Sequence, residues 1–383
     1  MRISADFECG NGKNIRKIGD AHFALETDGD EAPGYNYYFH LKLMGESKKE
    51  NLILDVCVDQ SLGEERYRNL GEDQTAVLWL RKNEGPWMRF IDFTVQNNNC
   101  YRISLSIGPG ETIYLSNMAP FPYSELSSWL EALAKKEKEF TQLYTEGKSS
   151  QGRDIYRFRI TNPKIPEKEK SKILVIGGEH GIEAPGLWAV RGIIEYLLTS
   201  ISCAVHIRDK YIIDIFPQIN PDGNVGGKDQ KNGAGVDIFR DFSGASSGKL
   251  PESKEGRRLW AWIEDNPPNI CLDFHGWISG PTCLRGNPPY QGAYVAPLTA
   301  YKTEEAKARQ TIVNDYLSWK TEALTYRNYF LPIKENNCLY QLASKYSSVG
   351  CLYEPNMYGG MIACKKTGAH VLNTVVEAVE SLD

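Results

Sequence analysis

Two residues that can bind a metal ion stand three positions apart in the segment KILVIGGEHGIE. His180 and Glu183 follow the apolar run Ile173–Ile176 and two glycines. On a turn that leaves a strand, an imidazole and a carboxylate at this spacing can bind one divalent ion. His275 in ICLDFHGW again ends a short apolar run and is the predicted third ligand. Two histidines and a glutamate are a recognised catalytic zinc set with an open fourth position.

The position of these residues favours a metal site over a structural role. The alternative is a surface turn for His180 and a hydrogen-bonded core histidine for His275. Both histidines lie where an apolar run gives way to glycine, and ligands bind at the carboxyl ends of strands in open α/β sheets. The other histidines have no comparable partner spacing and are interpreted as structural: His22, His40, His206 and His370.

A hydrolytic metal site also needs a group that takes a proton from water. Glu354 is the best candidate, because it ends the short run Cys351–Tyr353 and precedes Pro355. The alternative is a glutamate that caps a helix or lies on the surface. The strand-end position that Glu354 shares with the predicted ligands favours the role of general base.

The segment 220–242, NPDGNVGGKDQKNGAGVDIFRDF, is too rich in Gly, Asn and Asp for regular structure and indicates a functional loop. Asp237 could accept a hydrogen bond from the outer nitrogen of a ligating histidine. Arg240 could bind a substrate carboxylate through two hydrogen bonds. The alternatives are a simple turn at NPDG and pairing of Arg240 with Asp241 or Glu252.

The elements that must carry these residues change character along the chain. Residues 1–119 show short alternating runs separated by turn residues, which predicts a separate all-β sandwich domain. The predicted strands are 35–43, 52–58, 76–80, 88–95, 101–107 and 112–115.

Residues 120–383 alternate apolar runs with helical patterns, which predicts an α/β domain with a largely parallel sheet covered on both faces. Ser124 is expected to cap a helix that carries Leu126, Trp129 and Leu130. The predicted strands are 154–160, 173–176, 211–216, 270–274 and 351–353, and the predicted helices are 185–199, 254–264, 304–320 and 367–382.

Composition narrows the class of protein. A net charge of -5 and a pI near 5.8 argue against nucleic acid as a partner. No apolar run has the length that spans a membrane, and the first residues do not resemble a signal peptide, so we expect a cytoplasmic protein. Nine cysteines include Cys57, Cys271 and Cys351 within apolar runs, which favours small buried side chains in a reducing compartment over disulfides.

Five motifs then indicate a family. HGIE, NPDG, GVDIFR, DFHG and LYE occur in the order found in the zinc carboxypeptidases of the M14 type, which this chain resembles. The first half resembles the amino-terminal β-domain of the cytosolic carboxypeptidase branch in ISADFECGN, YNYYFHLKL and MAPFPYSELSSWL. The resemblance covers essentially the whole chain and implies a carboxypeptidase-like mixed sheet in the second domain.

The resemblance implies one Zn²⁺ ion bound by His180, Glu183 and His275, with Asp237 behind His180. It also implies that zinc-activated water hydrolyses a carboxy-terminal peptide or isopeptide bond, with Glu354 as general base. The resemblance implies a peptide as the substrate, and it implies no binding to nucleic acid or to a membrane. The oligomeric state is left open by the sequence.

The chain departs from the family at two positions. Phe239 stands where the family has asparagine, so half of the clamp for the terminal carboxylate is missing and Arg240 remains. Gln230 stands where the cytosolic branch has an arginine that polarises the scissile carbonyl. Loss of one oxyanion donor typically costs about 2.7–4 kcal/mol. Lys228 and Lys231 flank Gln230 and are candidates to restore the charge.

Two further site residues are predicted from position alone. Tyr340, upstream of Glu354, is the candidate tyrosine beside the scissile bond, with Tyr326, Tyr329 and Tyr346 as alternatives. Arg285 is the candidate cation for an acidic substrate side chain.

Two other functions remain open. Gly181 stands where the cytosolic branch has proline after the histidine, as in related deacylases and amidases, so an acylated amino acid is an alternative substrate. Alternatively, this chain is a catalytically impaired zinc-binding protein that docks a partner. Glu354 argues against that alternative, because a binding site needs no general base.

Overall fold

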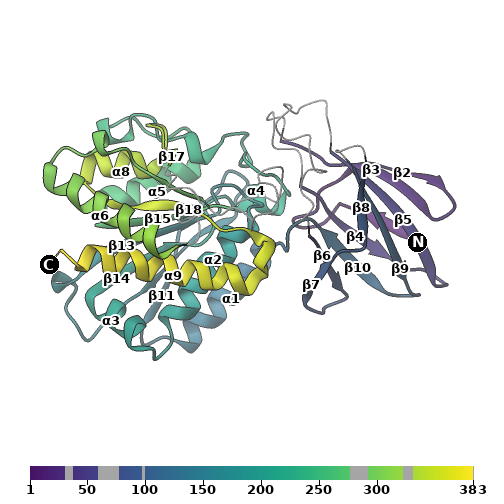
Figure 1. Cartoon of the computed structure of the whole chain (residues 1–383), viewed down its shortest axis with the longest axis horizontal. Coiled ribbons are helices and arrows are strands. Elements are labelled where there is room, and N and C mark those ends of the chain that lie inside the picture. Colours follow the sequence, from purple (N-terminus) through teal and green to yellow (C-terminus); the bar gives the residue numbers. More distant parts are fainter. Residues whose placement is uncertain (31–37, 59–76, 97–99, 277–291, 322–330, 383) are drawn as a thin grey trace.

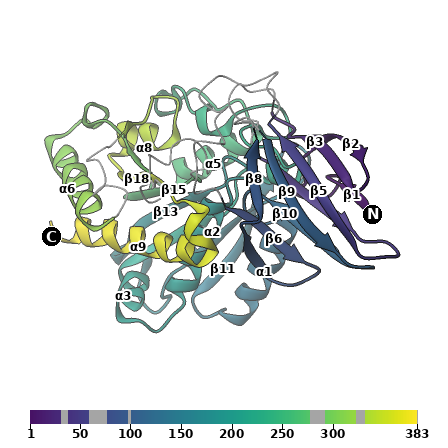
Figure 2. The same cartoon turned by 45° about the vertical axis from the view of Figure 1, so that its right-hand side comes forward.

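The structure is a computed structural model that describes residues 1–30, 38–58, 77–96, 100–276, 292–321 and 331–382. A β-sandwich at the amino-terminal end is followed by a mixed sheet flanked by helices (Figure 1). Figure 2 shows the two parts side by side, with the sandwich strands on the right. The predicted fold class, an all-β part followed by an α/β part, is confirmed.

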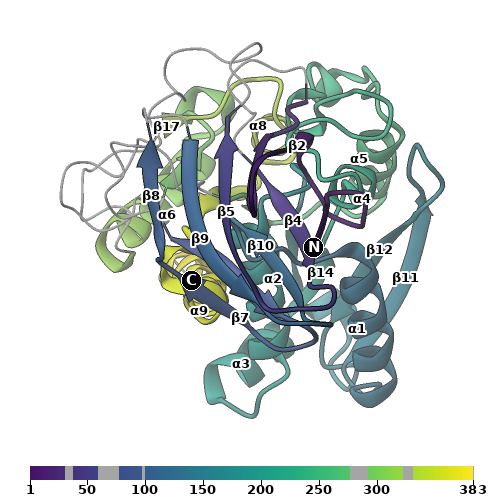
Figure 3. The same ribbon diagram turned by 90° about the vertical axis from the view of Figure 1, so that its right-hand side faces the viewer.

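Two five-stranded sheets make up the described part of the sandwich. The first has the strand order β1-β4-β10-β6-β7 and the second β2-β3-β5-β9-β8. Strands β5, β9 and β8 of the second sheet lie side by side in Figure 3. The strands are β1 (Arg2–Ser4), β2 (Lys13–Gly19), β3 (His22–Glu26), β4 (His40–Met44), β5 (Glu50–Cys57), β6 (Leu78–Lys82), β7 (Trp87–Phe90), β8 (Phe93–Gln96), β9 (Cys100–Ile107) and β10 (Thr112–Ser116).

Alternating apolar residues build the core of the sandwich. Leu43 on β4 pairs with Ile113 on β10, and Leu54 on β5 pairs with Ile103 on β9. All four side chains are fully buried, while their neighbours in sequence are mostly more exposed. The period of two therefore directs one face of each strand to the core, as the pattern predicts.

Some strands differ from the prediction. The single predicted strand 88–95 is wrong, because β7 pairs with β6 in the first sheet and β8 pairs with β9 in the second. Ile91 lies at the corner between them and is 77% exposed. Strand β2 was not predicted, because most of its residues are exposed and it therefore lacks an apolar alternation.

The second part contains a mixed sheet of eight described strands in the order β11-β12-β14-β13-β15-β18-β16-β17. Its strands are β11 (Thr141–Lys148), β12 (Asp154–Ile160), β13 (Ser171–Gly177), β14 (Tyr211–Phe216), β15 (Ile270–Phe274), β16 (Gly292–Val295), β17 (Leu331–Pro332) and β18 (Val349–Glu354). The helices are α1 (Tyr123–Lys136), α2 (Ala184–Leu197), α3 (Ser202–Lys210), α4 (Pro221–Val225), α5 (Lys254–Asp265), α6 (Glu304–Lys320), α8 (Cys338–Tyr346) and α9 (Gly360–Glu380). Short 3₁₀ turns are η2 (Glu167–Glu169), η3 (Ile238–Arg240), η4 (Ala245–Ser247), η5 (Leu298–Ala300) and η6 (Met357–Gly359).

The centre of this sheet is parallel and buried on both faces. Strands β14, β13, β15 and β18 pair in parallel, and their residues are almost all buried. Continuous apolar runs are typical of such strands. The register places Gly177 beside Phe274 and Phe274 beside Tyr353, so the residues that follow all three strands emerge at one edge.

Helices α2 and α9 pack closely against each other beside this sheet (Figure 2). A Cβ atom at Gly192 would lie 2.2 Å from the carbonyl oxygen of Lys365, and one at Gly368 would lie 2.2 Å from that of Ala189. Only glycine fits at these two crossing points. This packing fixes the position of α2, which begins directly after Glu183, the last residue of the predicted metal-binding segment.

Two helix predictions need correction, and some short helices were not predicted. Ser124 does not cap α1, because the N-cap residue is Pro122 and Ser124 lies inside the helix, where its amide donates to Glu8 (2.9 Å). Helix α9 begins at Gly360 instead of Thr367. Helices α3 and α8 were not predicted, because each has only nine residues and gives a short periodic signal.

The prediction that Cys57 is a free buried thiol is wrong. Cys57 ends β5 and faces Cys100, the first residue of β9, with 4.0 Å between their Cα atoms and a disulfide between their sulfurs. Cys271 and Cys351 are free and buried, as predicted. The pairing of the first two cysteines depends on strand register, which spacing in the sequence does not reveal.

Within the described ranges, no single helix combines the length and apolar composition needed to cross a membrane. The pair Ala184–Leu197 and Ser202–Lys210, bent by 93°, meets that test by length and composition only.

An ion pair on the second sheet of the sandwich gives a testable pH dependence. Arg102 donates to both oxygens of Asp55 (2.8 and 2.9 Å) and, together with His22, holds the pKa of Asp55 below its ordinary value of 3.8. We expect Asp55→Asn to lower the free energy of unfolding at neutral pH by about 0.2–1 kcal/mol.

Because the pKa of Asp55 is depressed in the folded state, the contribution is present above pH 3.8 and is lost as pH falls through the lower pKa of the fold. Urea unfolding at several pH values should show the variant and the parent converging in acid. Asp92→Asn, at an exposed position, is the control. A difference that stays constant with pH would contradict this assignment.

Candidate metal centre

Three side chains with metal-ligating atoms converge at the carboxyl ends of β13 and β15. His180 and Glu183 lie between β13 and α2, and His275 follows β15 directly. One oxygen of Glu183 is 2.8 Å from His180 Nδ1, and the other is 2.9 Å from His275 Nδ1. The ligand atoms lie within 4.8 Å of one another, and the residues are between 3% and 5% exposed. This donor set fits a zinc ion.

Two glycines allow the segment after β13 to turn into this geometry. Gly178 has a φ of +67°, and a Cβ atom there would lie 2.9 Å from Leu187. A Cβ atom at Gly181 would lie 2.3 Å from the backbone nitrogen of Asn224. Gly181 is therefore explained by close backbone packing, so its presence in place of proline does not by itself indicate an amidase.

Carboxylates lie behind both histidines. Asp237 Oδ1 is 3.5 Å from His180 Nε2, on the side of the ring opposite Glu183. Burial lowers the pKa of His180, but the charge of Glu183 and hydrogen bonds with Asp237 and Glu183 outweigh burial and raise that pKa well above its ordinary value. A carboxylate in this position fixes the ring and leaves Nδ1 for a metal ion.

A pair of buried acidic residues behind His275 was missed by sequence reasoning. Glu179 Oε2 is 3.2 Å and Asp273 Oδ2 is 3.6 Å from His275 Nε2. Burial, with the nearby Asp273 charge, raises the pKa of Glu179 to about 7. The signal was present in the sequence, because Asp273 and His275 are two residues apart and Glu179 directly precedes His180.

Glu354 ends β18, the strand next to β15, and His275 donates its backbone N–H to Tyr353 (3.1 Å). Burial, with the charge of Glu183, raises the pKa of Glu354 to about 8, although the two imidazoles oppose this rise. The hydroxyl of Tyr294 on β16 lies 3.5 Å from Glu354 Oε2. Tyr294 was not predicted, because it belongs to a strand that the sequence pattern did not reveal.

Phe239, which directly precedes Arg240, packs on the imidazole rings of His180 and His275. The ring centroid of Phe239 is 4.8 Å from that of His275 and 5.5 Å from that of His180, both edge-on. Arg240, the next residue, is 47% exposed at its side chain, and its Nη1 is 3.2 Å from Asp237 Oδ2. The partner of Arg240 is thus Asp237, and not the predicted alternatives Asp241 or Glu252. The Asp241 carboxylate instead accepts hydrogen bonds from the backbone amides of Glu252 and Ser253 before α5.

The three predicted polar residues of the loop before η3 differ in environment. Gln230 is 4% exposed, and its Nε2 atom has no hydrogen-bond partner among the described residues. Lys228 forms an ion pair with Asp28 of the sandwich, 3.0 Å away. The backbone amide of Lys231 donates to Asp30, also of the sandwich. The charge of Lys228 is therefore already engaged away from the metal-binding residues.

Tyr340 lies on α8 and is partly buried against the hydrophobic core, as is Tyr346. The structure gives neither a contact with Glu354, whereas it does give one for Tyr294. Arg285, Tyr326 and Tyr329 lie outside the described residues.

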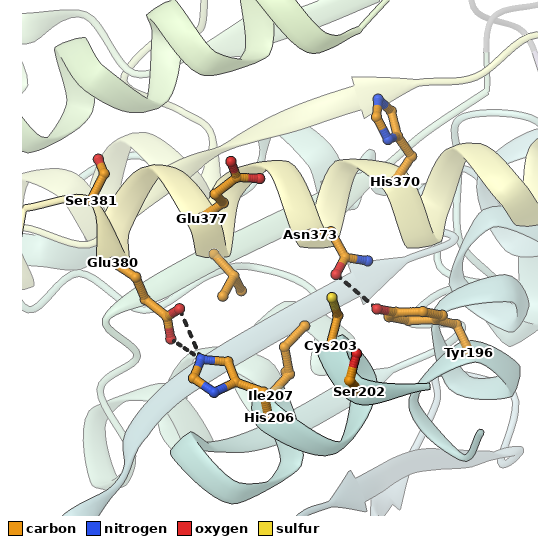
Figure 4. A pocket seen from close by; sticks show the side chains of 11 residues that line it. Tyr196, Ser202, Cys203, His206, Ile207, His370, Asn373, Glu377, Glu380 and Ser381 are labelled. Carbon is orange, nitrogen blue, oxygen red and sulfur yellow. Dashed lines mark hydrogen bonds and ion pairs between the residues drawn. The ribbon is translucent and has the colours of Figure 1, made fainter. Parts of the chain in front are cut away.

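A separate surface cavity of about 830 Å³ shares no residue with this cluster. It lies between α9, α3 and the end of α2 (Figure 4). His206 Nε2 is 2.9 Å from Glu380 there, and both side chains are partly exposed. The cavity is lined by Tyr196, Ser202, Cys203, His206, Ile207, His370, Asn373, Val376, Glu377, Glu380 and Ser381.

Comparison with solved structures establishes the fold. A metallo-carboxypeptidase from Burkholderia cenocepacia has a TM-score of 0.79 at 16% identity and covers 100% of both chains. A metallo-carboxypeptidase from Pseudomonas aeruginosa, in complex with (2-guanidinoethylmercapto)succinic acid, has a TM-score of 0.76 at 18% identity and covers 100% of both chains. At these identities the comparison shows that the chain has the fold of these metallo-carboxypeptidases.

Sequence comparison gives the family. Residues 126–278 match the family described as zinc carboxypeptidase. Cytosolic carboxypeptidase 2 of Danio rerio is 25% identical over 72% of this chain and 41% of its own length. Cytosolic carboxypeptidase 6 of Mus musculus is 23% identical over 85% of this chain and 60% of its own length. Residues 126–278 are thus similar to the zinc carboxypeptidase family, and the chain spans less than two thirds of the length of these distant curated relatives.

Zinc binding should depend on pH with a definite sign. The pKa values of His180 and His275 are raised in the metal-free protein, so each imidazole holds a proton that zinc must displace. We expect the apparent affinity for zinc to increase from about pH 6 to about pH 8, with proton release. Calorimetry in buffers of different ionisation enthalpy measures both. A dissociation constant that does not change over this range would contradict the assignment.

Proposed function

We propose that this protein is a zinc-dependent hydrolase that removes carboxy-terminal amino acids from peptides. The observation that carries the proposal is the position of Glu354 beside the group His180, Glu183 and His275, at the shared edge of β13, β15 and β18. A site that only stores or binds zinc needs no additional, partly buried carboxylate with a raised pKa. The similarity of residues 126–278 to the zinc carboxypeptidase family supports the same reaction.

His180, Glu183 and His275 are the proposed ligands of one Zn²⁺ ion, and Asp237 orients His180. When bound, zinc would act as a Lewis acid, which lowers the pKa of water and polarises a carbonyl group. Glu354 accepts a proton from the attacking water and returns it to the leaving amine. A carboxyl group whose pKa is raised towards the working pH is suited to both steps.

Two residues of the preceding loop contribute substrate binding in this proposal. Arg240 is half-exposed and binds the terminal carboxylate, because a guanidinium matches a carboxylate through two hydrogen bonds. Gln230 has a buried amide donor with no partner among the described residues and polarises the scissile carbonyl in place of the arginine of the cytosolic branch. A neutral donor stabilises an oxyanion less than a charged one, so a modest turnover rate follows.

A second candidate, a zinc amidase or deacylase, is favoured by Phe239. Its ring presents apolar surface beside both metal-binding imidazoles where a carboxypeptidase of this family presents an amide. Such a surface suits an acyl chain or an apolar side chain better than a second anchor for a carboxylate. The two candidates differ in whether the substrate must have a free carboxy terminus.

We propose further that residues 1–119 and 120–383 are two domains, and that the protein is cytoplasmic. The end of β10 at Ser116 and the start of α1 at Tyr123 support the domain boundary.

The names of the curated relatives support the cytoplasmic location. The Cys57–Cys100 disulfide argues against it, because disulfides persist mainly in oxidising compartments.

Glu354→Gln separates catalysis from metal binding. The amide keeps the size of the side chain but cannot accept the proton, so we expect a loss in kcat of about 10²–10⁴-fold. Zinc content, measured by mass spectrometry of the metal, should stay at the parent level. Glu335→Gln, an exposed position, is the control. Unchanged turnover in Glu354→Gln would remove Glu354 from the mechanism.

Arg240→Gln tests the substrate class. Hydrogen bonds to a charged group contribute about 1.5–3 kcal/mol, so we expect kcat/KM for free carboxy termini to fall by roughly 10–150-fold. Parent enzyme should not cleave the same peptides with amidated termini. Cleavage of amidated or acylated substrates, with little effect of Arg240→Gln, would establish the amidase. No cleavage of either set by the zinc-loaded parent would indicate a binding protein.

A further inference from the structure

The loop that carries Asp237 and Arg240 is held by a carboxylate from the sandwich. Asp30 lies 200 positions upstream of Gln230, yet its Oδ2 atom accepts hydrogen bonds from the backbone amides of Gln230 (2.7 Å) and Lys231 (3.0 Å). Asp30 is 6% exposed. We propose that Asp30 is a positioning residue of the metal centre, so that the sandwich completes a site whose reactive residues all lie elsewhere in the chain.

A continuous set of contacts connects Asp30 to a metal ligand. Lys231, whose amide Asp30 binds, forms an isolated antiparallel bridge with Asp237. Asp237 Oδ1 in turn lies 3.5 Å from His180 Nε2. On the other side of the loop, the carbonyl oxygen of Asp229 accepts from the amide of Gly181 (2.9 Å), which directly follows His180. The loop is therefore fixed between the sandwich and the metal-binding segment.

Other bonds from the sandwich reach the preceding part of the same loop. Asn11 Nδ2 donates to the carbonyl oxygen of Gly227 (3.0 Å), and the amide of Cys9 donates to Val225 (3.0 Å). A Cβ atom at Gly227 would lie 2.2 Å from the carbonyl oxygen of Gly10, so the two backbones are in close contact. These contacts fix the position of the loop, and Asp30 adds a bond to Lys231, the residue that pairs with Asp237.

The chemistry of Asp30 suits a fixed anchor. Burial raises its pKa above the ordinary 3.8, while three backbone hydrogen bonds and Lys228 act in the opposite direction. Hydrogen bonds to an ionised carboxylate are shorter and stronger than those to a neutral oxygen. Because one oxygen accepts both amides of the loop, an asparagine carbonyl at position 30 could keep the same two bonds without the charge.

This difference defines the experiment, which rests on the proposed zinc site. In the full chain, Asp30→Ala removes the acceptor, and we expect the zinc dissociation constant to rise by about 10–100-fold, as for other groups behind metal ligands. Asp30→Asn should restore most of the affinity. Asp28→Asn, which removes the exposed carboxylate that pairs with Lys228 and Lys13, is the matched control and should stay near the parent value. A chromophoric chelator in competition for zinc gives each constant.

Hydrogen exchange provides a second measurement that does not need zinc. In metal-free protein, the amides of Gln230 and Lys231 should exchange faster in Asp30→Ala than in the parent and in Asp30→Asn. A folded Asp30→Ala with parent zinc affinity would overturn the proposal. If Asp30→Ala does not fold, Asp30→Glu, which displaces the acceptor, takes its place. A parent that binds no zinc defeats the proposed function, and unchanged exchange in the variant then defeats this inference separately.

Discussion

The alignment of three parallel strands is the constraint on which the site depends. Strands β13, β15 and β18 pair side by side, and the register brings their carboxyl ends to one edge of the sheet. The chain places the proposed ligands His180 and Glu183 after the first strand, the proposed ligand His275 after the second and Glu354 at the end of the third. Residues separated by more than 170 positions thus become neighbours without any local sequence signal that links them.

The same edge concentrates negative charge in a buried place. The carboxylates around the two imidazoles are Glu179, Glu183, Asp237, Asp273 and Glu354. Burial and mutual repulsion raise the pKa of Glu179 to about 7 and that of Glu354 to about 8, whereas the two imidazoles hold the pKa of Glu183 at about 2. A divalent ion among these groups would reverse this balance, so the arrangement of charge and the donor set point to the same chemistry.

The sequence predicted what depends on strand ends and failed where distant segments meet. His180, Glu183, His275 and Glu354 were predicted as site residues because each follows a buried apolar run, and such runs also identify the central strands. The Cys57–Cys100 disulfide was missed because it depends on register between β5 and β9. Asp30 was missed for a related reason, because its proposed role depends on hydrogen bonds from backbone amides of a loop 200 positions away. The pattern of side chains along the sequence does not predict such bonds.

The most direct test of the central claim is anomalous diffraction from crystals soaked in zinc, with data on both sides of the zinc absorption edge. The account predicts one strong anomalous peak bonded to Nδ1 of His180, Nδ1 of His275 and the carboxylate of Glu183. A peak at another place, such as His206 and Glu380, with none among these three residues would contradict it.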